Sequence, residues 1–113
     1  MSRRDWTLFV ADMLEACDKI IDYTSGMSFD AFCADTRTVD AVVRNLEIIG
    51  EASKGIPDEK KCLKPEIDWA AIKGLRNRIV HDYFGLSLAV IWAIVQQDLP
   101  RLSQQLGLWP NDS

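Results

Sequence analysis

Apolar side chains recur at helical spacing along almost the whole chain, and no useful length alternates with the period of two that a half-buried strand requires. The spacing i, i+3, i+4, i+7 predicts a first amphipathic helix over residues 4–24. Ser28 is placed to cap a short helical turn over residues 29–33. Asp35 or Thr36 then caps a second long helix. The chain is therefore expected to fold into helices.

Glycine, proline and serine residues mark where the later helices are expected to begin and end. Gly55 and Pro57 stop the second helix and open a polar, lysine-rich loop that runs to Pro65. Pro65 itself suits the first turn of a third helix, and Ser87 suits the N-cap of a fourth. Pro100 removes a helical hydrogen bond, so it is expected to kink or split that fourth helix.

Four helices joined by short connections predict an all-α fold. We expect an antiparallel, up-and-down four-helix bundle formed by residues 1–113 as one domain. Trp109 and Pro110, with the polar residues after them, are interpreted as a tail. The four tryptophans and four phenylalanines are more aromatic mass than a small bundle needs. Because homodimers are the commonest oligomers, part of this surface is expected to be buried between two subunits.

The net charge of −4 argues on its face against a nucleic-acid partner, but the charge is unevenly distributed. Residues 54–78 carry seven basic and four acidic side chains, whereas residues 1–53 carry five basic and ten acidic ones. Two interpretations of the basic segment stay open. It is either a chance cluster on a solvated loop and helix, or a local anion site on an otherwise acidic protein.

Three cysteines, Cys17, Cys33 and Cys62, form an odd set without paired spacing. This argues against a disulfide framework and for a reducing, cytoplasmic location. The sequence has no CxxC pair and no Cys/His cluster, so a structural zinc site is not expected. No other metal and no cofactor is expected either. It also has no run of about 18 apolar residues, so no membrane span is expected.

The single histidine, His81, lies close in sequence to two arginines. An imidazole beside guanidinium groups can combine proton transfer with phosphate stabilisation. In a continuous helix, Arg76 and His81 would lie about 140° apart around the axis. Arg78 and Asn77 would instead lie on the same face as His81. Arg76 can meet His81 if the helix ends near Val80, or if a second subunit supplies the partner residue.

A purely structural interpretation stays open for the charged residues. A histidine or an arginine near the C-terminal end of a helix can simply complement the helix dipole. Glu47 and Glu51 lie one turn apart and could hold a metal ion, but no histidine accompanies them. A solvated or salt-bridged pair, with Arg44 or Lys54 as the partner, is the more frequent outcome of such spacing.

Residues 76–83, RNRIVHDY, resemble the R-x-x-x-x-H-x-Y motif of HepT-like proteins. These proteins belong to the HEPN superfamily (higher eukaryotes and prokaryotes nucleotide-binding). Residues 41–52 and 98–100 resemble the second and fourth helices of the family, so the resemblance covers nearly the whole chain. The motif itself shows no departure from the family pattern.

This resemblance implies a HEPN-like helical homodimer that is the toxin of a type VII-like toxin–antitoxin pair. The other member of the pair is a minimal nucleotidyltransferase (MNT). Carried over by position, Arg76 and His81 become the catalytic pair of a metal-independent endoribonuclease. Tyr83 becomes the residue to which the transferase adds AMP, or a group that binds the substrate. The neighbours that are candidates for binding RNA phosphates are Lys73, Asn77 and Arg78.

The implied chemistry needs only a base, an acid and a cation. RNA carries its own nucleophile, the 2′-hydroxyl, and an imidazole can take its proton near neutral pH. Arginine can hold the phosphate and stabilise charge on it. With one histidine per chain, a two-fold dimer can supply a base from one subunit and an acid from the other. The composite cleft would cut transfer or messenger RNA and leave a 2′,3′-cyclic phosphate. The alternative function is a non-catalytic substrate-binding or regulatory partner of a nucleotidyltransferase.

Overall fold

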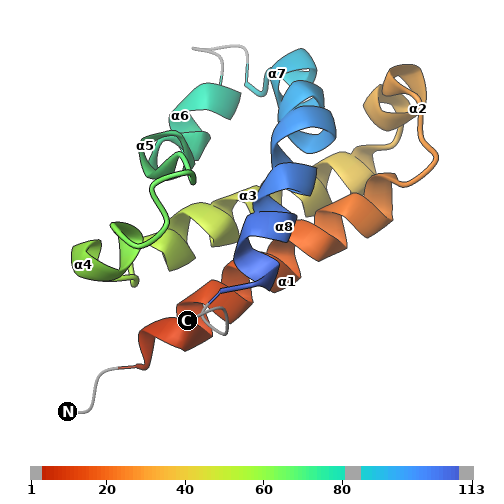
Figure 1. The fold of residues 1–113 in the computed structure, drawn as a ribbon. Coiled ribbons are helices and arrows are strands. Elements are labelled where there is room, and N and C mark those ends of the chain that lie inside the picture. The colour runs from red at the N-terminus through yellow and green to blue at the C-terminus, as the bar shows by residue number, and fades with distance from the viewer. Residues whose placement is uncertain (1–3, 81–84, 110–113) are drawn as a thin grey trace.

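Two long helices form the base of the fold in the computed structural model, which describes residues 4–80 and 85–109 (Figure 1). α1 (Trp6–Thr24) and α3 (Thr36–Ser53) lie side by side and run in opposite directions. The short α2 (Phe29–Ala34) connects them. The apolar stripes of both long helices are buried, so the predicted first and second helices are confirmed.

Side-chain caps fix where the second and third of these helices begin. The Ser28 hydroxyl accepts a hydrogen bond from the backbone N–H of Ala31 at 3.0 Å and caps α2 as predicted. The Asp35 carboxylate accepts one from the backbone N–H of Thr38 at 3.1 Å, so Asp35 rather than Thr36 caps α3. This backbone hydrogen bond lowers the pKa of the Asp35 carboxyl, because it stabilises the ionised form.

The segment after α3 departs from the sequence prediction. A short helix, α4 (Asp58–Lys61), lies within the expected loop. The next helix, α5 (Trp69–Lys73), begins four residues beyond Pro65, so the predicted start at Pro65 is wrong. The reason is a cap: the Asp68 carboxylate accepts a hydrogen bond from the backbone N–H of Ala71 at 3.0 Å. Such an acceptor satisfies a backbone donor at the start of a helix, which proline does not do.

The last helical rod is interrupted, as Pro100 predicts. It consists of α7 (Leu88–Ala93), a π-helical turn η2 (Ile94–Asp98) and α8 (Leu99–Gly107), and α8 packs on α1 (Figure 1). The backbone N–H of Leu99 donates to the carbonyl of Ile94, five residues earlier. The proline ring would clash with the carbonyl four residues before it in a regular helix, and the widened turn lies directly before that ring. Ser87 holds the N-cap position of α7, without a side-chain hydrogen bond.

Trp109 is buried, which contradicts its interpretation as part of a tail. Its side chain is only 6% exposed. The centroid of its ring lies 5.1 Å from that of Trp6 in α1 and 6.0 Å from that of Trp69 in α5. Aromatic rings gain much from such burial, and the partners are too distant in sequence to leave a periodic signal. Pro110, the other residue of the predicted tail, lies outside the described residues.

Helices account for the regular structure of the described ranges, in which the only β feature is an isolated antiparallel bridge between Val80 and Leu86. The all-α prediction is confirmed, while the four-helix bundle topology and the homodimer stay predictions. No helix within these ranges is long and apolar enough to cross a membrane. Cys17, Cys33 and Cys62 are free thiols, and burial raises the pKa of Cys17 to about 12.

Candidate functional site

Three of the predicted site residues lie on a short helix that follows α5, and a fourth, Lys73, is the last residue of α5. Gly74, at φ −90° and ψ 8°, breaks the helical backbone between α5 and α6 (Leu75–Ile79). Leu75 and Ile79 are buried and anchor α6 on the core, with 4% and 1% of their surfaces exposed. The polar residues between these two anchors are consequently exposed, and they are Arg76, Asn77 and Arg78.

Arg76 faces a cavity of about 240 Å³ between α6 and α3. We call it the Arg76 cavity. Lys73 and Asn77 line it beside Arg76, so the structure brings three of the predicted site residues together. The opposite wall is the α3 face that carries the two glutamates singled out in the sequence. The lining residues of this wall are Leu46, Glu47, Gly50 and Glu51 of α3 and Lys54, which caps its C-terminal end.

The two glutamates of this wall differ in their partners. Glu51 accepts a hydrogen bond from the ammonium group of Lys54 at 3.1 Å, which confirms one of the predicted salt bridges. Glu47 has neither an ion pair nor a side-chain hydrogen bond within residues 4–80 and 85–109. The guanidinium of Arg76 is likewise unpaired in these ranges. In the same part of the chain, no group of three histidine, cysteine, aspartate or glutamate residues could hold a metal ion.

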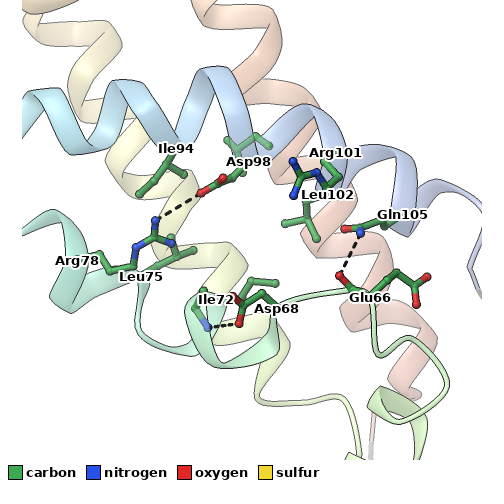
Figure 2. Close-up of a pocket in the computed structure, with 12 residues that line it drawn as sticks. Glu66, Asp68, Ile72, Leu75, Arg78, Ile94, Asp98, Arg101, Leu102 and Gln105 are labelled. Atoms are coloured by element: carbon green, nitrogen blue, oxygen red, sulfur yellow. Dashed lines mark hydrogen bonds and ion pairs between the residues drawn. The ribbon is translucent and has the colours of Figure 1, made fainter.

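Arg78 is directed to the other side of α6. Its guanidinium forms an ion pair with the carboxylate of Asp98, at the end of η2, with an N–O distance of 3.4 Å (Figure 2). The pair lies at a second cavity, of about 400 Å³, which we call the Arg78 cavity. Its apolar lining includes Leu75, Ile94 and Leu102, and its charged lining includes Arg101 and Glu66 (Figure 2). The structure therefore separates Arg78 from the other predicted phosphate-binding residues.

Asp98 and Arg101 are polar residues of this second cavity that the sequence did not identify as belonging to a site. Asp98 stands twenty positions after Arg78, and the two meet only because η2 packs opposite α6. Local spacing carries no signal for a contact of that kind. The resemblance of residues 98–100 to a family helix was the single hint that this segment matters.

The chain leaves its helix directly before the histidine of the motif. α6 ends at Ile79, and Val80 is extended, with φ −93° and ψ 128°. The Ser87 backbone N–H donates to the carbonyl of Ile79 at 2.8 Å, so the chain returns to its starting point within a few residues. Gly85 has φ +85°, which favours glycine at this return. The predicted helix end near Val80 is confirmed, while both routes by which Arg76 could meet His81 stay predictions. His81 and Tyr83 lie outside the described residues.

Known proteins are similar to this chain over most of its length. A family model described as Ribonuclease HepT-like matches residues 13–107. The chain is 43% identical over 94 residues to "Probable ribonuclease HepT" of Thermococcus cleftensis, a match that covers 83% of this chain and 86% of that protein. It is 40% identical over 100 residues to "Putative RNase MJ0127" of Methanocaldococcus jannaschii, with coverages of 88% and 83%. It is 36% identical over 108 residues to "Putative RNase MJ1380" of the same organism, with coverages of 96% and 99%. No solved structure matches the chain significantly.

Proposed function

The chain belongs to the HepT-like ribonuclease family, and from this premise we propose that it is an endoribonuclease with Arg76 and His81 as its catalytic pair. The observation that carries the proposal is the environment of Arg76. Its guanidinium is exposed, unpaired within the described residues, and shares a cavity with Lys73 and Asn77. A free guanidinium beside a second cation and an amide donor suits one RNA phosphate.

The reaction follows from the groups that the motif supplies. Arg76 stabilises the negative charge that develops on the phosphate during attack by the 2′-hydroxyl. His81 serves one of the two proton transfers. Because the chain has one histidine, a homodimer with a composite cleft lets two subunits divide the roles of base and acid. The products are a 2′,3′-cyclic phosphate and a free 5′-hydroxyl, and no metal ion takes part.

We further propose that the protein is the toxin of a toxin–antitoxin pair, held inactive by an MNT-type nucleotidyltransferase. Transfer of AMP to Tyr83 adds bulk and a negative charge two residues from His81 in the sequence. A negative charge there repels the RNA backbone and so blocks cleavage. Lys73 and Asn77 remain the candidate phosphate contacts on the Arg76 side.

RNA cleavage by the purified protein in excess chelator tests the enzymatic proposal. The native protein is expected to cut transfer or messenger RNA and to leave 3′ ends that carry a cyclic phosphate, whereas His81→Ala does not cut. Equal cleavage by both proteins, or cleavage that the chelator abolishes, would contradict the proposed mechanism.

Incubation with an MNT-type nucleotidyltransferase and ATP tests the antitoxin proposal. Intact-mass and peptide measurements are expected to find one added AMP on Tyr83 and none on Tyr83→Phe. Modification of another residue would remove Tyr83 from the proposed switch while leaving the ribonuclease proposal in place.

One observation favours the second candidate function, a non-catalytic partner of a nucleotidyltransferase. The net charge is −4, and the Arg76 cavity carries two carboxylates that repel RNA. Toxicity on induction in cells separates the two functions, because only a ribonuclease loses toxicity in His81→Ala. Undiminished toxicity in His81→Ala, or no toxicity at all, would favour the partner function.

A further inference from the structure

We propose that Glu47 is the general base of this site and that its carboxylate takes the proton from the RNA 2′-hydroxyl. The inference rests on the proposed ribonuclease function and adds to it a residue that lies far from the motif in sequence. It follows from the arrangement of the Arg76 cavity, in which α3 supplies carboxylates to the wall opposite the motif.

The position of Glu47 is fixed by a rigid part of the molecule. Leu46 and Ile49, its neighbours on α3, are fully buried, so this turn of the helix is anchored in the core. α5 packs closely on the same helix, because a Cβ added to Gly50 would lie 3.4 Å from the carbonyl oxygen of Ile72. A group carried by packed helices is held in place more accurately than one carried by a loop.

The dimensions of the cavity suit one phosphate and its sugar. At about 240 Å³, it is smaller than the range of about 300–1,000 Å³ that is usual for pockets holding whole small molecules. Arg76 and Lys73 line one wall and can hold the phosphate, while Glu47 lines the other. The 2′-hydroxyl of the ribose whose 3′-oxygen carries that phosphate is thereby brought between a cation and a carboxylate.

Glu47 is better suited to this role than the second glutamate of the wall. The Glu51 carboxylate is engaged by the ammonium group of Lys54 at 3.1 Å. The Glu47 carboxylate has no such partner in the described part of the chain, so its oxygens can accept a proton or a hydrogen bond from substrate. Glu47 also lines a neighbouring cavity, together with Arg44 of the same helix and Asp12 of α1.

The step balances in atoms and charge. Glu47 accepts the proton of the 2′-hydroxyl, the O2′–P bond forms, and the P–O5′ bond breaks. The leaving 5′-oxygen receives its proton from the acid of the proposed function, so Glu47 replaces the histidine that a second subunit would otherwise supply as the base. Arg76 stabilises the added charge on the phosphate between the two transfers. The carboxylic acid and the neutral imidazole then exchange protons with water and return to their starting forms.

The first experiment compares Glu47→Gln with Glu15→Gln in RNA cleavage. Glu15 is a matched control: it is exposed on α1, pairs with Lys19 at 3.2 Å, and its replacement changes the net charge equally. Loss of a general base is expected to lower kcat of Glu47→Gln by about 10²–10⁴-fold with little change in KM. Glu15→Gln should cleave RNA like the native protein. Glu51→Gln should lower kcat by less than about tenfold, because it removes only a weak, exposed ion pair with Lys54.

The second experiment separates a chemical role from a structural one. Added formate is expected to restore part of the activity of Glu47→Ala, since it returns a carboxylate to the cavity, whereas chloride at equal ionic strength should not. Circular dichroism and thermal unfolding establish that each variant is folded.

The outcomes distinguish this inference from the function on which it rests. If Arg76→Ala and His81→Ala lose cleavage while Glu47→Gln keeps it, the ribonuclease stands and the base assignment is overturned. A folded Glu47→Ala that formate does not restore, or a larger loss in Glu51→Gln than in Glu47→Gln, also overturns the assignment. If the native protein does not cut RNA, both proposals fail.

Discussion

Arg76 and Arg78 stand two positions apart and face different parts of the molecule. Two residues correspond to about 200° of rotation around an α-helix, so the two side chains leave α6 on opposite sides. Arg76 faces α3 and has no ion pair within the described residues. Arg78 faces η2 and is paired with Asp98 at 3.4 Å. One guanidinium is available to a substrate, while the other already has an anionic partner.

The same comparison holds for the cavities on either side of α6. The Arg76 cavity is small and carries charges on both walls, whereas the Arg78 cavity is larger and has an apolar lining with charges around it. Leu75 lines both of them. α6 therefore separates the two cavities, and the residues on its two sides are expected to respond differently to substitution.

The largest difference is expected in catalysis. Arg76→Ala should lower kcat for RNA cleavage by about 10²–10³-fold, which is the usual loss when one donor to a developing oxyanion is removed. Arg78→Ala should lower it by less than about tenfold, since an exposed ion pair contributes about 0.2–1 kcal/mol. Single-turnover cleavage of the same RNA by both variants measures the ratio. Equal losses would mean that both guanidinium groups reach the RNA and that the comparison fails.

The second effect is on the free energy of unfolding and concerns Leu75, which separates the two cavities. Leu75→Ala removes a side chain that is 4% exposed and lines both cavities. Replacement of buried leucine by alanine commonly costs about 2–5 kcal/mol. Urea unfolding should place Leu75→Ala in this range and leave exposed Arg76→Ala within about 0.5 kcal/mol of the native protein. If Leu75→Ala lowers the free energy of unfolding by less than about 1 kcal/mol, the surrounding side chains must move into the space that the leucine leaves.

How much of this could be predicted from the sequence depends on the distance between the contacting residues. α1 and α3 were predicted because their buried stripes are continuous and local. The capped start of α5 was missed, although Asp68 followed by an apolar run is a local signal. The burial of Trp109 was missed because its ring partners, Trp6 and Trp69, are distant in the chain.

The candidate site divides in the same way. The motif identified Arg76, and simple helical spacing placed Arg78 elsewhere on the helix. The sequence could not say which of the two guanidinium groups forms an ion pair. The partner of Arg78 is Asp98, which lies on the helical rod that follows Gly85. The α3 wall of the Arg76 cavity was equally invisible: Glu47 and Glu51 were recognised as a pair, but their position opposite Arg76 depends on tertiary packing.

The third effect tests whether the Arg78–Asp98 pair contributes to folding. A double-mutant cycle with Arg78→Ala and Asp98→Ala is expected to give a coupling of about 0.2–1 kcal/mol, because both side chains are partly exposed, at 40% and 48%. Urea unfolding at low and high salt measures it, and salt should reduce it. A coupling near zero would mean that the ion pair does not stabilise the fold, so the two arginines would no longer differ in this respect.

The smallest effect concerns the N-terminal cap of α3, the helix that carries the glutamates of the Arg76 cavity. The pKa of Asp35 is lowered by the backbone hydrogen bond from Thr38. The folded-state pKa thus lies below that of the unfolded chain, so the cap contributes fully above the ordinary aspartate range and is lost as pH falls through the lowered value. Asp35→Asn should unfold in urea with a weaker dependence on pH below about pH 5 than the native protein. An unchanged dependence would show that the cap does not couple to folding.

The π-helical turn η2 has a consequence for how the length of this chain can change. A π turn holds one residue more than the α-helical turn around it, and Gln96 and Gln97 in η2 are exposed. Substitutions at either glutamine should be well tolerated, because the side chains face water. Removal of one residue there would return η2 to the spacing of a regular α-helix, so α7 and α8 would keep their relative orientation. The rings of Trp92 and Phe32, whose centroids are 5.0 Å apart, should then stay in contact. The ring of Pro100 would instead clash with the carbonyl four residues before it, so the number of residues in this segment is set by the proline that follows it.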